Sequence, residues 1–329
     1  MDHKNDKISD CKIIMIKSEI AEIKSEDKIN ALSILDPYNA QIKEGGLRTK
    51  GILKQSLENK PLFSVVTVTF NSNKFLKNAI ISIINQTYDN IEFIIIDGGS
   101  TDGTINIIKK YEDKIDYWIS EPDKGIYDAM NKGIDFAKGE WIAFLNSDDI
   151  YSSNNTIDVF ANAICKNPTI ELFYGKVAVI EKGRFLYYAG RQITSRDYWY
   201  PTKCMCHQAI FFKREVFNRF GKFEIIANGG ISDNIWLVNF FYFQQGKALF
   251  INEVVSNFSC GGYYEQHGFE AYWALVRFAN KRFPFLIRLR FYIRLPELLI
   301  KFKVFQLHKD TAFRKWYRNI KYKVMPPRS

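Results

Sequence analysis

Four apolar runs alternate with amphipathic helical patterns in the first half of the chain. Residues 62–69 are β-branched and apolar with turn residues on both sides, which is typical of a strand buried on both faces. Similar runs follow at 91–96, 115–119 and 141–145. We therefore predict four strands in the interior of one sheet.

A helical pattern follows each of the first three runs. Apolar residues recur at helical spacing over 74–86, over 104–111 and again from residue 126, so each helix has one face that can pack on a sheet. Residues 71–73, Asn-Ser-Asn, are of the types that cap helices. Alternating strands and helices imply right-handed crossovers and a mostly parallel, Rossmann-like α/β sheet with helices on both faces.

Weaker patterns continue beyond the fourth strand. The predicted elements are a helix over 151–165, two strands within 171–189 around a turn at 181–184, a buried strand at 209–212 and a closing strand at 248–255. We divide the chain into an N-terminal extension (1–60), an α/β domain (61–265) and a basic helical tail (266–329).

Polar and acidic residues follow the ends of the predicted strands. Ligands of such sheets bind beyond the carboxyl ends of the strands, where Asn71, Asp97, Asp123 and Asp148 all fall. Several carboxylates at one edge repel one another unless a cation compensates them, and hard oxygen ligands suit Mg²⁺ or Mn²⁺. Such a cation keeps waters and takes its other ligands from a diphosphate. The edge is therefore predicted to bind a nucleotide diphosphate with a metal.

Four segments carry a family resemblance. Residues 64–71, 96–104, 123–133 and 146–149 resemble, in order and spacing, the motifs of the family 2 glycosyltransferases, which are inverting enzymes with the GT-A fold. The resemblance covers about residues 61–262. It implies a sugar-nucleotide donor, a divalent metal and an acceptor hydroxyl.

The resemblance also implies roles for single residues on the donor side. Asp97 would hydrogen-bond the base, and Asp148 stands where the family's Asp-x-Asp motif has its last, metal-binding carboxylate, a role that Asp149 can share. Asn146 departs from the motif, because an amide can bond ribose or a metal-bound water but brings no charge. The remaining residues expected along the donor are Thr69, Phe70, Asn71, Asp123, Gly125 and Asn131.

An inverting transfer also needs a general base for the acceptor hydroxyl. The family has an Asp at the start of a late helix before an aromatic-aliphatic run, and residues 231–238 fit that description, so the resemblance implies Asp233. His207 and Gln208 also resemble a family segment, with a role toward the acceptor or the diphosphate. The metal would serve as Lewis acid for the departing diphosphate.

Each of these residues also has a structural explanation. Asp97 and Asp102 fit a tight turn with a cap for the next helix, and Asp148 and Asp149 fit a solvated turn. Asp233 can cap the helix that follows it, and a lone His at the start of a strand is often structural. The sequence leaves these alternatives open.

Length and composition bound the remaining questions. The chain has 329 residues, 47% of them apolar, which is ample for one large domain with appendages. No apolar run approaches the roughly 18–20 residues of a membrane span, and residues 1–9 lack the apolar core of a signal peptide, so we expect a cytoplasmic protein with reduced thiols. Residues 45–51 either wrap back onto the domain or form a plain linker, the reading we prefer.

Positive charge is concentrated in the tail. Residues 281–329 hold fourteen Lys and Arg against Glu297 and Asp310, a net charge of +12, whereas the whole chain carries +10. Aromatic and aliphatic residues interleave with these charges, a pattern that favours peripheral contact with an anionic membrane on its inner, cytoplasmic face. Packing on the domain and an oligomer contact remain alternatives. A nucleic-acid partner is not expected, because no recognised binding module accompanies the charge.

The expected function is transfer of a sugar with inversion, in assembly of a bacterial surface polysaccharide such as O-antigen, capsule or exopolysaccharide, or of its lipid-linked precursor. A nicotinamide-dependent dehydrogenase would share the sheet but needs Gly-x-Gly-x-x-Gly after the first strand, and residues 71–74 do not provide it. A degenerate member that binds a sugar nucleotide or glycan as a scaffold remains the non-enzymatic alternative.

Overall fold

The computed structural model of the protein describes residues 42–226, 231–259, 273–274, 276–285, 288–289 and 292. The chain divides into two units, Met1–Lys43 and Glu44–Ser329. The second unit holds the sheet and its helices, and the predicted boundary at residue 265 lies outside the described residues.

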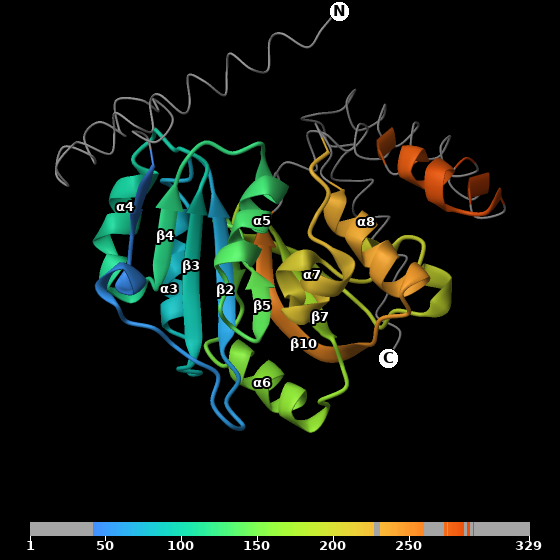
Figure 1. Cartoon of the computed structure of the whole chain (residues 1–329), viewed down its shortest axis with the longest axis horizontal. Helices are drawn as coiled ribbons and strands as arrows, with labels where there is room; N and C mark the ends of the chain where they lie inside the picture. Colours follow the sequence, from blue (N-terminus) through green and yellow to red (C-terminus); the bar gives the residue numbers. More distant parts are fainter. Residues whose placement is uncertain are drawn as a thin grey trace, which may run out of the picture. The chain divides into compact units, whose positions relative to one another are not determined.

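The four predicted strands form the parallel part of the sheet (Figure 1). They are β2 (Phe63–Thr69), β3 (Ile91–Asp97), β4 (Tyr117–Ser120) and β5 (Trp141–Phe144). Every neighbouring pair in the order β4-β3-β2-β5 runs parallel, with Val65 opposite both Phe93 and Ala143. Their carboxyl ends therefore lie at one edge, as predicted.

Helices cover both faces of these strands because alternate side chains point to opposite sides. Phe63 and Val65 join the cluster that contains α3 (Leu76–Ile84), whereas Val66 and Val68 join the cluster that contains α5 (Ile126–Phe136). The third crossover helix is α4 (Thr104–Lys110). The predicted strand and helix alternation is confirmed, and the helix ends differ from the predicted ones by one or two residues.

The later strands make the sheet mixed. The order continues from β5 through β9 (Ile210–Lys213), β7 (Leu172–Glu181) and β10 (Ala248–Ser259) to β6 (Ile150–Tyr151), and β8 (Arg184–Ala189) pairs with β7. β9 runs antiparallel to β5 and β7, whereas β10 and β7 are parallel. The two-residue β6 was not predicted, and it ties the loop after β5 to β10.

Short helices surround these later strands. After β6 comes α6 (Thr156–Lys166), and α7 (Glu215–Phe220), also unpredicted, follows β9. α8 (Ser232–Val238) continues into a π-helix, η7 (Asn239–Phe243). Three 3-10 turns lie between β8 and β9, namely η4 (Ser195–Asp197), η5 (Pro201–Lys203) and η6 (His207–Ala209).

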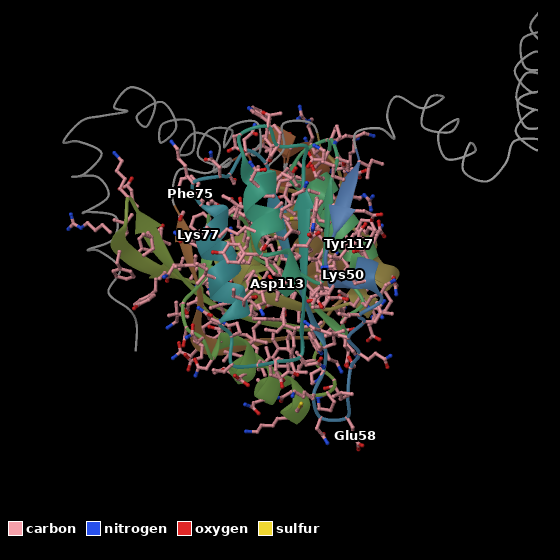
Figure 2. All side chains as sticks on the ribbon, turned by 90° about the vertical axis from the view of Figure 1, so that its left-hand side faces the viewer. Lys50, Glu58, Phe75, Lys77, Asp113 and Tyr117 are labelled. Carbon is pink, nitrogen blue, oxygen red and sulfur yellow. The ribbon has the colours of Figure 1, made fainter. Side chains whose placement is uncertain are left out.

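The segment before β2 packs onto the domain rather than forming a plain linker. β1 (Lys43–Gly45) extends the sheet beside β4, and η2 (Leu47–Lys50) follows it. The Arg48 guanidinium forms a buried ion pair with Glu92 and donates two hydrogen bonds of 2.8 Å to the carbonyl of Phe136. Figure 2 labels Lys50 and Tyr117, which lie at this edge.

The described start of the C-terminal tail packs on α8. Val276, Ala279 and Phe283 are buried in a cluster with Ile235 and Val238. For these residues the alternative of packing on the domain is correct, and most of the basic tail lies outside the described residues. Among the helices that the structure describes, none is both long and apolar enough to cross a membrane.

Candidate active site

The loops after β2 and β3 are held together by hydrogen bonds. The Asn71 N–H donates to Ser100 Oγ (2.7 Å), Asn71 Oδ1 accepts from the Thr101 N–H (2.9 Å), and the Asn73 N–H donates to Asp102 Oδ2 (3.0 Å). The prediction that residues 71–73 cap a helix is wrong, because α3 begins after Phe75 without a side-chain cap. These polar side chains fix the neighbouring loop instead.

Asp97 shapes this edge from within. Its side chain is fully buried at the end of β3 and accepts hydrogen bonds from the N–H groups of Gly99 and Ser100 and from the hydroxyls of Ser100 and Ser120, at 2.5 to 3.0 Å. The turn reading is therefore correct for Asp97. Its contact with a base stays a prediction.

Two residues predicted on the donor side, Phe70 and Asp123, lie beside Gly98, and a third, Gly125, bonds Asp123. A Cβ atom on Gly98 would lie 2.5 Å from Asp123 Oδ2 and 3.4 Å from the Phe70 ring, so only glycine allows this approach. The Phe70 ring is 62% exposed, and burial raises the pKa of the Asp123 carboxyl. The Gly125 N–H donates to Asp123 Oδ1 (2.8 Å) from the start of α5, with a φ of +112° that favours glycine.

Thr69 and Asn131 occupy different surroundings. Thr69 ends β2, and its buried hydroxyl has no hydrogen-bond partner within the described chain. The Asn131 amide bonds both backbone groups of Phe223, with Nδ2 2.8 Å from the carbonyl and Oδ1 3.0 Å from the nitrogen. Asn131 thus ties α5 to residues 221–226 through both polar atoms of its side chain.

The acidic loop after β5 is anchored at both ends. Ser147 Oγ lies 2.8 Å from Ser72 Oγ, which connects this loop to the one after β2. Asp149 is buried, and its Oδ1 accepts from the Ser259 N–H (3.0 Å) at the end of β10. Burial, and then the charge of Asp148, raise the pKa of Asp149, whereas Ser259 and the adjacent buried Gln208 oppose this shift.

The candidate base belongs to a group of four polar side chains. Asp233 lies in the first turn of α8, with Oδ2 3.4 Å from His207 Nδ1 and Oδ1 3.0 Å from the hydroxyl of Tyr127 on α5. His207 Nε2 lies 3.3 Å from Asn146 Nδ2. The structure thus joins Asn146, His207 and Asp233, all predicted, with Tyr127, which sequence reasoning missed although it lies within the 123–133 motif.

The loop after β5 offers oxygen ligands to a hard cation. Burial raises the pKa of the Asp148 carboxyl, and the nearby His207 opposes this shift. The buried Oδ1 of Asn146 has no hydrogen-bond partner among the described residues. Across those residues, no three His, Cys, Asp or Glu side chains gather as a metal site. Mg²⁺ and Mn²⁺ do not need a complete protein cage, since they keep waters and bind substrate phosphates. The residues therefore fit one such ion held together with a diphosphate.

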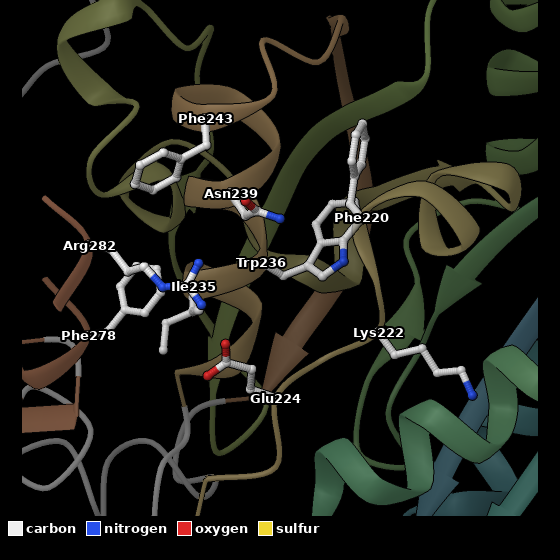
Figure 3. A pocket seen from close by; sticks show the side chains of 9 residues that line it. All are labelled: Phe220, Lys222, Glu224, Ile235, Trp236, Asn239, Phe243, Phe278 and Arg282. Atoms are coloured by element: carbon white, nitrogen blue, oxygen red, sulfur yellow. The ribbon is translucent and has the colours of Figure 1, made fainter.

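Two hollows are lined by other residues. One of about 200 Å³ abuts α8 and includes Ile235, Trp236 and Asn239 together with Phe278 and Arg282 of the tail (Figure 3). The other, of about 220 Å³, lies in the loop between β8 and β9. None of the residues predicted for the donor, the metal or the base lines either hollow, so the candidate site is the edge formed by the loops after β2 to β5 and the start of α8.

Comparison with known proteins identifies the family of this arrangement. The profile described as Glycosyl transferase family 2 matches residues 64–226. A PGL/p-HBAD biosynthesis glycosyltransferase of Mycobacterium bovis is 32% identical over 168 residues, 50% of this chain and 64% of the relative. An uncharacterized glycosyltransferase of Haemophilus influenzae is 37% identical over 112 residues, 33% of this chain and 44% of the relative. The matches span less than two thirds of these relatives.

Solved structures share the fold. S. aureus TarS in complex with UDP-GlcNAc superposes with a TM-score of 0.53 at 18% identity, over 66% of this chain and 65% of that one. TarS in complex with UDP gives a TM-score of 0.51 at the same identity, over 66% and 64%. At this identity the likeness concerns the fold alone.

Proposed function

The chain belongs to glycosyl transferase family 2, and on that premise we propose that it transfers a sugar, with inversion, from a nucleotide-diphosphate sugar to an acceptor hydroxyl. The observation that carries this proposal is the contact of Asp233 with His207 and Tyr127, with Asn146 beside His207. It brings the candidate base to the same edge as the acidic loop after β5. A transfer enzyme needs the base and the acidic loop at the same place, where the donor and the acceptor meet.

The donor would lie across the loops after β2, β3 and β4. The exposed Phe70 ring offers a flat surface for a base or ribose, and Asp123 with Gly125 borders it. One structural neighbour, TarS, was solved with UDP and with UDP-GlcNAc, which supports a nucleotide-sugar donor for this chain. Asn71 and Asp97 act through the shape of these loops, because their side chains are already engaged within them.

Asp148 is our candidate metal ligand, with the Asn146 carbonyl beside it. Asp149 would contribute by fixing the loop, since Ser259 holds its carboxyl group. A bound Mg²⁺ or Mn²⁺ would supply Lewis-acid stabilisation of the departing diphosphate. The raised pKa of Asp148 fits this role, because a partly buried carboxylate without a cation is costly to charge.

Asp233 would accept the proton of the acceptor hydroxyl while the acceptor oxygen bonds the anomeric carbon. The bond from that carbon to the diphosphate breaks, and its electron pair leaves with the nucleotide. Tyr127 and His207 would hold the carboxylate in position.

The acceptor is proposed to be a glycan or lipid-linked glycan of a bacterial surface polysaccharide. A curated relative is named for PGL biosynthesis, which fits a glycolipid product in general terms. The basic tail would hold the enzyme against the inner face of the cytoplasmic membrane, where its net charge of +12 over residues 281–329 meets anionic lipids.

The first test separates an enzyme from a binding scaffold. Asp233→Asn keeps the shape of the side chain but removes the base, so we expect glycan assembly in cells, or transfer in vitro, to fall about 10²-fold or more. Glu224→Gln, an exposed change on the neighbouring segment, serves as the control. If Asp233→Asn retains full activity, the assignment of the base is wrong.

The second test addresses the donor side. UDP, GDP, CDP and dTDP are titrated by calorimetry with and without Mn²⁺ against the wild-type protein and Asp148→Asn. We expect one nucleotide to bind in a metal-dependent way, and Asp148→Asn to remove the metal dependence. Lack of binding at millimolar concentration would contradict the donor assignment, and binding without transfer would favour the scaffold alternative.

A further inference from the structure

The loop between β8 and β9 forms the pocket of about 220 Å³ noted above. We infer that this pocket binds an anionic group, a phosphate or a carboxylate, carried by the acceptor sugar. The inference rests on the proposed function and specifies its acceptor. The lining residues are Arg191, Arg196, Asp197, Trp199, Tyr200 and Lys203.

Charge in the pocket is only partly compensated. Arg191 makes a forked pair with Asp197, at 2.7 and 3.0 Å, and the same carboxylate accepts from the N–H and hydroxyl of Thr194. That pair is neutral and held in place. Among the described residues, no carboxylate lies within ion-pair distance of Arg196 or Lys203. Two positive charges therefore remain for a ligand.

Aromatic rings orient one of these charges. Lys203 Nζ lies 4.5 Å from the ring centroid of Trp199 and 5.0 Å from that of Tyr200, within the range of a cation–π contact. The two rings lie 6.1 Å apart at an interplanar angle of 30°, and both border the ammonium group. The volume of the pocket, about 220 Å³, is below the roughly 300 Å³ of pockets that hold drug-sized ligands. One charged sugar unit fits such a space better than an extended glycan.

The pocket is fixed to the helix that carries the candidate base. Both the N–H and the hydroxyl of Thr202 donate to Asn234 Oδ1, at 3.2 and 2.8 Å, and Asn234 directly follows Asp233. Tyr198 stacks on Phe241 with ring centroids 5.2 Å apart, which anchors the same loop to η7. A group bound in the pocket would hold its sugar beside the first turn of α8, which also carries Asp233.

The anion has two possible sources, the diphosphate of a lipid-linked sugar or the carboxylate of an acidic sugar. We would measure binding of N-acetylglucosamine 1-phosphate, glucuronic acid and neutral N-acetylglucosamine to the full chain by calorimetry. Each titration is run alone and with Mn²⁺ plus the nucleotide diphosphate that binds in the donor test. We expect one of the two anionic probes to bind at least tenfold more tightly than the neutral sugar, and that probe identifies the source.

Charge variants assign the effect to this pocket. Arg196→Gln with Lys203→Gln should weaken the anionic probe at least tenfold, whereas Arg196→Lys with Lys203→Arg should stay within twofold of the wild type. The control, Lys166→Gln with Arg184→Gln, removes the same charge from exposed positions outside the pocket. All four substituted positions are exposed, and thermal melting verifies that each variant is folded.

Two outcomes overturn the inference. One is equal affinity of the wild type for the anionic and neutral probes, and the other is unchanged affinity in the Arg196→Gln, Lys203→Gln variant. If the nucleotide still binds, either result contradicts only the inference about this pocket and not the proposed donor site. If no nucleotide binds, the proposed function fails, and the titrations without nucleotide still decide whether the pocket takes an anion.

Discussion

Tyr127 links two halves of the candidate site through one hydrogen bond. Its hydroxyl comes from α5, a helix that packs on the parallel strands β2 and β3, and contacts Asp233 on α8. Burial, and then the adjacent carboxylate, raise the pKa of Tyr127 well above its usual value, so the phenol keeps its proton and donates. Tyr127 is therefore a positioning residue for the base.

Replacing Tyr127 by Phe tests this role. The ring keeps its packing on Phe223, with centroids 5.6 Å apart, while the hydrogen bond to a charged group is lost, an effect of about 1.5 to 3 kcal/mol. We expect kcat to fall about tenfold or more and the Kd of the nucleotide to stay within twofold. A merely structural role would instead lower the melting temperature and leave the kcat of the folded protein unchanged.

Asp197 gives a prediction about pH. Its hydrogen bonds with Arg191 and Thr194 lower its pKa below the usual value. The lowered pKa stabilises the folded state fully at pH values above the pKa of the carboxyl in the unfolded chain, which is about 4. This stability is lost as the pH falls through the folded-state pKa. Asp197→Asn should therefore lower the free energy of unfolding at pH 7 by about 1 to 2 kcal/mol, discounted for partial exposure.

The check is urea unfolding of Asp197→Asn and wild type from pH 7 down to pH 3. The difference in unfolding free energy should begin to shrink as the pH falls below about 4, because the carboxyl of the unfolded chain is protonated before that of the folded chain. A difference that stays constant with pH would show that the charge of Asp197 does not matter to stability.

At the scale of elements, the segment before β2 is held by a buried charge. Glu92 is 2% exposed and pairs with Arg48 of η2, which is 11% exposed. Removing one partner of a buried pair leaves the other uncompensated, so Arg48→Ala should lower the free energy of unfolding by about 3 kcal/mol. Urea unfolding measures this loss, and Lys50→Ala, at an exposed position of the same turn, should change it by less than about 0.5 kcal/mol. Equal effects would contradict the role of the pair.

The parallel half of the fold was predictable because each of its strands is a continuous apolar run and each of its helices carries its own hydrophobic period. β6 and α7 were not, since a two-residue strand has no period and exists only through its pairing with β10. The residues 45–51 looked like a linker because their partners, such as Glu92, lie far along the chain.

The candidate site divides in the same way. Motif spacing identified Asn146, His207 and Asp233, which the fold brings together. Tyr127 was read as part of a helix because its partner lies 106 positions away. The side chains of Asn131, Asn71 and Asn73 form hydrogen bonds with backbone groups of neighbouring segments. Nothing in these residue types distinguishes such a structural role from ligand binding.

At the scale of the whole molecule, the positive charge is concentrated in the C-terminal tail. Residues 293–329 carry ten Lys and Arg against two acids, and each basic residue near an anionic surface contributes about 1 kcal/mol. Ending the chain at Tyr292 should lower binding to phosphatidylglycerol vesicles at least tenfold, measured by sedimentation, and leave nucleotide affinity unchanged. Equal sedimentation of both chains would refute membrane contact through this segment.

Ser259, in the last strand, completes the acidic loop through bonds to residues 110 and 111 positions earlier. At about 5 to 20 residues per second, the ribosome needs roughly 5 to 20 seconds to make that intervening chain. During this time the strands β2 to β5 can already pair, while the loop that would bind a metal has no anchor and the candidate base is still missing or newly made. A growing chain would thus acquire its donor surface before its chemistry, and transfer activity would appear only when β10 joins the sheet.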